Sequence, residues 1–215
     1  DIAGTGDFAG VMNAYNLRAD RGNSDYDRRQ MLILNYVYAL PFFNTSTGSL
    51  RTALGGWQLS GITTFQTGTP FSVFVPGDPA GIGSVGTVRA NLVGNPNNGS
   101  KTADAYFNTA AFAGVDNVGA NGSTGFGDSG RNVVYGAGRN QWDISLFKNF
   151  TGIPLHSTEG ATVQFRAEFF NAFNHTQFNG YFSTYQPPSI QNRNFGGANG
   201  AHDPRVVQFG LKFIF

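Results

Sequence analysis

Apolar and polar side chains alternate along the last ten residues of the chain. Phe209, Leu211 and Phe213 fall on one side of an extended strand and Gln208 and Lys212 on the other, because strand side chains point alternately to two faces. A strand of a water-soluble protein would bury such an apolar stripe against a core. A strand of a transmembrane β-barrel would show the stripe to lipid and turn the polar residues toward a polar lumen.

The same alternation recurs in four earlier segments, and the connections between the segments are alternately short and long. Strands are expected near residues 28–40, 53–68, 139–150, 161–172 and 204–215. Short turns are expected near 41–53 and 151–161, and long loops at 1–27, 69–137 and 174–203. Short periplasmic turns and long extracellular loops are typical of outer-membrane barrels. The pattern therefore predicts an all-β fold, an antiparallel meander of five long strands that forms the C-terminal part of a transmembrane β-barrel.

The strand pattern also assigns individual side chains to lipid or lumen. Arg166 and Glu168 share a face, and a charge on the lipid side would cost about 2–4 kcal/mol at the bilayer midplane. The residues expected to face the lumen are Asp143, Gln164, Arg166, Glu168, Gln208 and Lys212. Those expected to face lipid are Leu34, Trp57, Leu59, Trp142, Ile144, Phe165, Phe169, Phe209, Leu211 and Phe213. The lumen charges are expected either to contact a plug or solute or to form a structural network among themselves.

Composition supports strands joined by flexible loops. Charged residues are 13% of the chain, Gly is 30 and Phe is 21 of 215 residues, whereas a helical protein would carry more Ala, Leu, Glu and Lys. No run of 18 apolar residues occurs, so no transmembrane helix is expected. The net charge of +1 suggests no nucleic-acid partner, and the absence of Cys removes disulfides and thiolate metal sites.

Motifs for chemistry are sparse. Gly81 to Gly86 fits G-x-G-x-x-G but lacks a strand-to-helix context, and no Ser/His/Asp group has the setting of a nucleophile. His175 and His202 could approach each other across one loop, but turn-capping polar residues are the simpler interpretation. We therefore expect no enzyme activity, no cofactor and no metal. Aromatic residues of the loops could form a ligand vestibule or merely pack the loops together: Tyr106, Phe107, Phe112, Phe126, Tyr135, Tyr181 and Tyr185.

Six segments carry a likeness to a known family: 25–30, 55–62, 66–71, 106–112, 138–150 and 166–175. They resemble the C-terminal part of TonB-dependent outer-membrane receptors, in the subgroup with a carboxypeptidase-regulatory-like N-terminal domain that is common in acidobacteria. The chain end also resembles the terminal signal by which outer-membrane barrels present their last strand for insertion, carried by Gln208, Gly210, Phe213 and Phe215.

The resemblance implies a parent barrel of about 22 strands around a plug, of which residues 1–215 would be a fragment supplying the last five. Five strands cannot close a barrel, which needs about eight. The implied partners are outer-membrane lipid, the barrel assembly machinery, the TonB complex through a missing N-terminal part, and an unknown transported solute. The rival interpretation is a secreted or surface β-sandwich adhesion module, whose apolar faces would have to meet one another.

Overall fold

The computed structural model describes residues 11–43, 45, 47–153, 161–187 and 194–214, which divide into two compact units. The sheet unit comprises Met31–Gln66, Arg139–Thr176 and Asp203–Phe215. The loop unit comprises Asp1–Gln30, Thr67–Gly138 and Gln177–His202. The loops expected between the long strands thus gather into a unit of their own.

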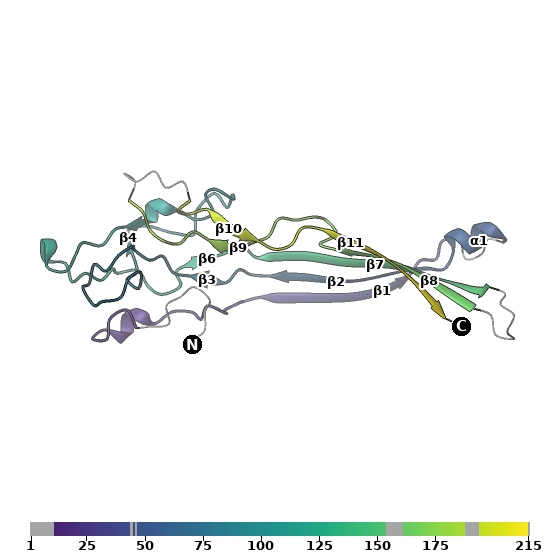
Figure 1. The fold of residues 1–215 in the computed structure, drawn as a ribbon, viewed down its shortest axis with the longest axis horizontal. Helices are drawn as coiled ribbons and strands as arrows, with labels where there is room; N and C mark the ends of the chain where they lie inside the picture. Colours follow the sequence, from purple (N-terminus) through teal and green to yellow (C-terminus); the bar gives the residue numbers. More distant parts are fainter. Residues whose placement is uncertain (1–10, 44, 46, 154–160, 188–193, 215) are drawn as a thin grey trace. The chain divides into compact units, whose positions relative to one another are not determined.

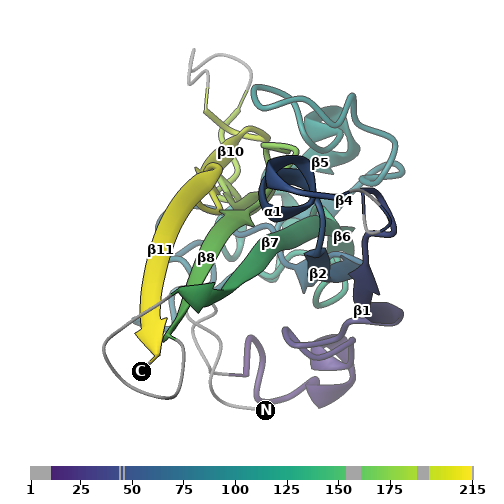
Figure 2. The ribbon, with the colours of Figure 1, turned by 90° about the vertical axis from the view of Figure 1, so that its right-hand side faces the viewer.

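The sheet unit is built on five antiparallel strands in the order β1-β2-β7-β8-β11 (Figure 1). Their bounds are β1 (Met31–Ala39), β2 (Trp57–Gln66), β7 (Arg139–Ile153), β8 (Ala161–Phe170) and β11 (Val206–Ile214). Each strand pairs with the neighbour expected from the sequence, and the sheet curves from β11 to β1 (Figure 2). The predicted all-β meander is confirmed.

The strand register places the two sets of side chains on opposite faces. Directly opposed residues of an antiparallel pair share a face, so the pairs Leu211 with Phe165 and Leu59 with Leu146 belong to one apolar face. Gln208 pairs with Glu168 on the other, polar face. All ten residues expected to contact lipid fall on the apolar face by these registers, and the six expected lumen residues fall on the polar face.

The apolar face is not covered by other parts of the described chain. Phe209, Leu211 and Phe213 are 66–68% exposed. A sandwich would bury these side chains against a second sheet. Their exposure therefore favours a sheet whose apolar face contacts something other than this chain, such as lipid. The polar face is not uniformly polar, because Ile33 and Val37 of β1 lie on it and are 52% and 67% exposed.

The first connection differs from the expected turn. Helix α1 (Ser49–Leu54) occupies part of it, and β2 begins at Trp57 instead of near residue 53. The Trp57 indole Nε1 donates to the Ala53 carbonyl at 3.2 Å, and Gly56 takes a φ of 70° that suits glycine. The pair Gly55-Gly56 therefore separates a helical turn from the strand. In the next turn region, β7 runs on to Ile153.

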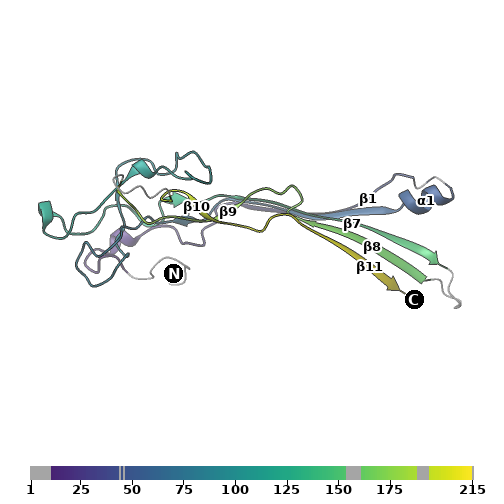
Figure 3. The ribbon, with the colours of Figure 1, turned by 45° about the horizontal axis from the view of Figure 1, so that its top comes forward.

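The loop unit contains short elements where irregular loops were expected (Figure 3). Among its described residues, three two-stranded ribbons form: β3 (Pro70–Phe71) with β6 (Val134–Tyr135), β4 (Asn91–Leu92) with β5 (Phe112–Ala113), and β9 (Phe178–Tyr181) with β10 (Ala198–Ala201). The single-turn helices are η1 (Leu17–Asp20), η2 (Thr109–Ala111) and η3 (Ala120–Gly122).

A hydrophobic core holds the loop unit together. Val73, Val88, Ala90 and Val134 are fully buried, and Phe107 is 1% exposed. Alternation could not reveal this core, because its residues come from separate short segments. The long loop expected over residues 69–137 therefore contributes most of a buried core, which the sequence pattern did not predict.

A buried ion pair fastens the N-terminal segment to this core. Arg89 is 4% exposed, and its Nη1 lies 2.7 Å from an Asp20 carboxylate oxygen. Its other guanidinium nitrogens donate to the carbonyls of Ala19 and Ser129 at 2.9 and 3.0 Å. The residues 1–27, expected to be a plain loop, thus contribute a charged partner and the buried Met12 to the unit. Within the described residues, no helix is long and apolar enough to cross a membrane.

Candidate ligand-binding cavity

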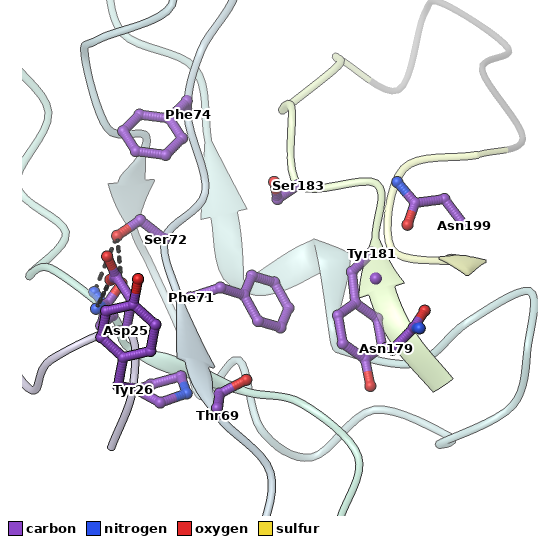
Figure 4. Close-up of a pocket in the computed structure, with 13 residues that line it drawn as sticks. Asp25, Tyr26, Thr69, Phe71, Ser72, Phe74, Asn179, Tyr181, Ser183 and Asn199 are labelled. Atoms are coloured by element: carbon purple, nitrogen blue, oxygen red, sulfur yellow. Dashed lines mark hydrogen bonds between the residues drawn. The ribbon is translucent and has the colours of Figure 1, made fainter. Parts of the chain in front are cut away.

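A cavity of about 440 Å³ lies within the loop unit (Figure 4). Ligand sites commonly measure about 300–1,000 Å³. Its lining combines aromatic rings, hydroxyls, amides and a carboxylate, contributed by residues 25–26, 69–72, 74, 132, 179–181, 183 and 199. Segments far apart in the sequence therefore converge on one site.

Backbone hydrogen bonds bring two walls of the cavity together. The Phe74 amide donates to the Ser183 carbonyl at 3.1 Å, and the Tyr185 amide donates to the Phe74 carbonyl at 2.6 Å. Strand β3 ends at Phe71, directly before Ser72, and the β9–β10 ribbon places Tyr181 opposite Ala198. The cavity walls are thus held by the main chain and do not depend on side-chain contacts alone.

One wall is aromatic. The rings of Phe71 and Tyr181 stack with centroids 4.9 Å apart and planes 7° from parallel. The Tyr181 hydroxyl accepts the Ala137 amide at 2.5 Å, and the Tyr106 ring lies 4.6 Å from the Tyr181 ring. Burial raises the pKa of Tyr181, so its hydroxyl stays protonated at neutral pH.

The opposite wall is polar and internally bonded. The Ser72 hydroxyl donates to Asn132 Oδ1 at 3.0 Å and accepts a hydrogen bond from the backbone N–H of Asn132 at 2.9 Å. Asn132 Nδ2 donates to an Asp25 carboxylate oxygen, and Arg131 Nη2 lies 3.3 Å from the other oxygen. The carboxylate of Asp25 is therefore partly neutralised inside the protein.

Two amides at the cavity edge remain open. Asn179 on β9 and Asn199 on β10 are exposed and line the cavity. Each lies close to a glycine of the opposite strand: a Cβ built on Gly180 would stand 2.2 Å from Asn199 Oδ1, and one on Gly200 would stand 2.4 Å from Asn179 Oδ1. The glycines leave room for both amides beside the ribbon.

The seven aromatic residues expected in a vestibule have different places. Tyr181 lines the cavity, whereas Phe107 and Phe112 are buried in the core at 1% and 5% exposure, and Tyr106 is 7% exposed. Phe126 and Tyr185 pack against the core. Tyr135 accepts from Asn23 and Arg29, each at 2.7 Å. Burial removes Phe107 and Phe112 from any ligand surface, so they support the site from behind.

The polar face of the sheet unit carries a hydrogen-bonded row. Arg166 Nε donates to Gln164 Oε1 at 2.7 Å, and Gln164 Nε2 donates to Asn149 Oδ1 at 2.8 Å. Asp143 accepts from Gln141 Nε2 at 2.9 and 3.0 Å and from the Asn171 amide at 2.9 Å. Lys212 lies opposite Gln164. The register unites the six predicted lumen residues on one face, and their exposure to a lumen stays a prediction.

The apolar face has one charged exception that alternation did not anticipate. Lys148 pairs with Trp57 and Phe165 on this face and is 3% exposed. Its ammonium donates to the Gly55 carbonyl and lies 5.7 Å from the Trp57 ring centroid and 5.0 Å from that of Phe150. Aromatic faces and a carbonyl thus replace the water that the cation would otherwise need.

Of the expected assembly signal, Gln208, Gly210 and Phe213 lie in β11, and Phe215 lies outside the described residues. Among the residues that the structure describes, no group of three His, Asp or Glu side chains could hold a metal ion.

Comparison with known proteins assigns the chain to a family. A family model described as an outer membrane beta barrel domain matches residues 1–208. The chain belongs to the outer membrane beta barrel domain family. No curated protein and no solved structure matches the chain.

Because the chain belongs to this family, the domain is located in the bacterial outer membrane. The meander, with its uncovered apolar face, has the form of one segment of such a barrel wall. The β-sandwich interpretation is set aside, because a sandwich would need a second sheet against the apolar face.

Sequence reasoning missed most of the cavity. The segments that contain Asp25, Ser72 and Asn132 were expected to be loops. Nothing in the spacing of these residues along the sequence predicts that they lie close together. Asn179-Gly180 and Asn199-Gly200 are two of four Asn-Gly dipeptides in the sequence, so the dipeptide alone does not single out the cavity. Asn-Gly usually marks a tight turn, whereas these two lie within the paired strands β9 and β10.

Proposed function

We propose that this barrel domain is the C-terminal wall and outer-loop part of a TonB-dependent receptor, which takes up a solute with energy supplied through TonB. The family assignment supports the barrel, and the resemblance of segments such as 138–150 and 166–175 supports the receptor subgroup. In this proposal the sheet unit builds wall and the loop unit captures the solute.

The observation that carries the proposal is the folded loop unit. A passive barrel needs only short or flexible connections between its strands, whereas these connections form a core and enclose a cavity of about 440 Å³. Ordered long loops in compact proteins usually serve function. A capture site of this kind suits a receptor that concentrates a scarce solute before transport.

The proposal assigns no bond chemistry to the chain. It gives the domain four partners: outer-membrane lipid, the assembly machinery, the transported solute and, through a more N-terminal part of the receptor, the TonB complex. No role in nucleic-acid binding is proposed, in line with the net charge of +1.

The proposal can be tested with the full-length protein purified in detergent. We expect it to bind the periplasmic domain of TonB in isothermal titration calorimetry, and to give no steady large conductance in planar bilayers because a plug fills the barrel. Lack of TonB binding together with a stable open-channel conductance would contradict the proposal and indicate a passive porin.

A further inference from the structure

The charges around the cavity of the loop unit restrict the ligands that it can hold. Asp25 is the one charged side chain that lines the cavity in the described part of the chain. Its carboxylate is engaged by Asn132 and Arg131. An anionic ligand would therefore find no cation in the lining, and a strongly cationic one would compete with Arg131 for a single carboxylate.

The open hydrogen-bonding groups of the cavity act as both donors and acceptors. No hydrogen bond of the Asn179 or Asn199 side chain occurs within the described residues, and each amide offers a donor and an acceptor. The hydroxyls of Thr69 and Ser183 line the same space and have the same dual character. Such groups suit a ligand whose own groups are hydroxyls, because a hydroxyl also donates and accepts.

Aromatic rings make up much of the remaining lining. Phe71, Phe74 and Tyr181 are partly exposed in the cavity, and Figure 4 shows Phe71 and Tyr181 between Ser72 and Asn179. Because Phe71 and Tyr181 stack on each other, a ligand would meet the edges of these rings and the Phe74 ring in the middle, and amides and hydroxyls at the margin. Sugar rings have the matching form, with apolar C–H faces and a rim of hydroxyls.

We propose that this cavity binds a neutral oligosaccharide. The inference rests on the proposed function, in which it names the class of transported solute. A neutral peptide is the weaker candidate, because extended peptides bind chiefly through main-chain hydrogen bonds to a strand edge, whereas the open groups of this cavity are side-chain amides and hydroxyls.

The test is a binding screen of the full-length protein in detergent. The probes are neutral hexasaccharides (maltohexaose, cellohexaose, xylohexaose and laminarihexaose), the acidic hexagalacturonate and a neutral hexapeptide library, followed by calorimetry. We expect at least one neutral hexasaccharide to bind and hexagalacturonate to bind at least roughly tenfold more weakly, since it would bury unpaired carboxylates.

Variants locate the binding. Replacing both amides (Asn179→Ala with Asn199→Ala) should weaken binding roughly tenfold or more through lost hydrogen bonds. Gly180→Ala should also weaken it, because the new Cβ displaces only the flexible Asn199 side chain. Asn98→Ala, an exposed asparagine outside the cavity, is the matched control and should bind normally. An unchanged affinity in the double variant would overturn the proposal.

The other outcomes of the binding screen also test the ligand class. Preference for hexagalacturonate, capture of peptides in place of sugars, or no binding of any neutral hexasaccharide would each overturn the ligand class. Uptake in cells separates this result from the receptor proposal. Oligosaccharide binding without TonB-dependent uptake would contradict the receptor, whereas TonB-dependent uptake of another solute would contradict only the oligosaccharide.

Discussion

At the scale of single residues, the buried pair of Arg89 and Asp20 is expected to stabilise the loop unit. Arg89→Met removes the partner of Asp20, which is 16% exposed in its side chain, and leaves a carboxylate poorly solvated. Breaking a buried pair in this way typically costs about 3–5 kcal/mol. We expect proteolysis of the loop unit at a protease concentration that leaves the wild type intact.

A control separates the pair from the packing of Arg89. The double variant Arg89→Met with Asp20→Asn removes both charges and should recover part of the lost protease resistance. Equal sensitivity of wild type and Arg89→Met would contradict the structural role of the pair.

Tyr181 offers a finer test of the cavity wall. Tyr181→Phe keeps the ring stacked on Phe71 and removes the hydroxyl that accepts the Ala137 amide. Loss of one such bond usually costs about 1 kcal/mol, so exchange of the Ala137 amide hydrogen should accelerate severalfold. An unchanged exchange rate in hydrogen-exchange mass spectrometry would show that this bond does not hold the wall.

Residue-level prediction from the sequence worked where one repeating rule applied. Period-two alternation placed Phe165 and Arg166 on opposite faces, and the register agrees. It could not place Lys148, because the aromatic rings and the Gly55 carbonyl that receive its charge come from other segments. It could not find Arg89 either, since its partner Asp20 lies 69 positions away.

At the scale of elements, β11 is expected to control assembly. A polar replacement of Phe215 in the full-length protein should sharply reduce outer-membrane insertion, because Phe215 belongs to the expected insertion signal and β11 must present its apolar face to lipid and pair to close the barrel. Membrane fractionation with heat-modifiable gel mobility measures the inserted fraction.

The matched deletion removes the exposed tip from Asn117 to Gly122, which contains η3. It should leave insertion intact, because changes in loop length cost little. Normal insertion of the Phe215 variant together with failure of the deletion would contradict the assembly role of the chain end.

Long elements were predictable and short ones were not. The five strands each repeat the alternation over nine or more residues, which is enough to identify a face. Ribbons such as β3–β6 span two residues per strand and exist because Phe71 and Val134 pack together with the core of the loop unit. Helix α1, with six residues, lay in a segment whose Pro and Gly predicted only a turn.

At the scale of the whole molecule, the sheet unit corresponds to the barrel wall predicted from the sequence, and the loop unit corresponds to the predicted long loops. The sheet unit has exposed apolar side chains and the pattern of a membrane wall, whereas the loop unit has its own buried core and a cavity. Fold class and location followed from alternation and connection lengths. The cavity did not, because it depends on tertiary contacts among segments without periodicity.

The central claim is that one face of this sheet contacts lipid and the other contacts water. The chain contains no Cys, so single cysteines at Phe165, Leu211, Gln164 and Lys212 can be labelled with bimane in the full-length protein, after removal of any cysteine elsewhere, in lipid vesicles. We predict quenching by spin-labelled lipid at Phe165 and Leu211, and quenching by iodide at Gln164 and Lys212. The reverse pattern, or quenching by iodide at all four positions, would contradict the assignment of this sheet to a membrane wall.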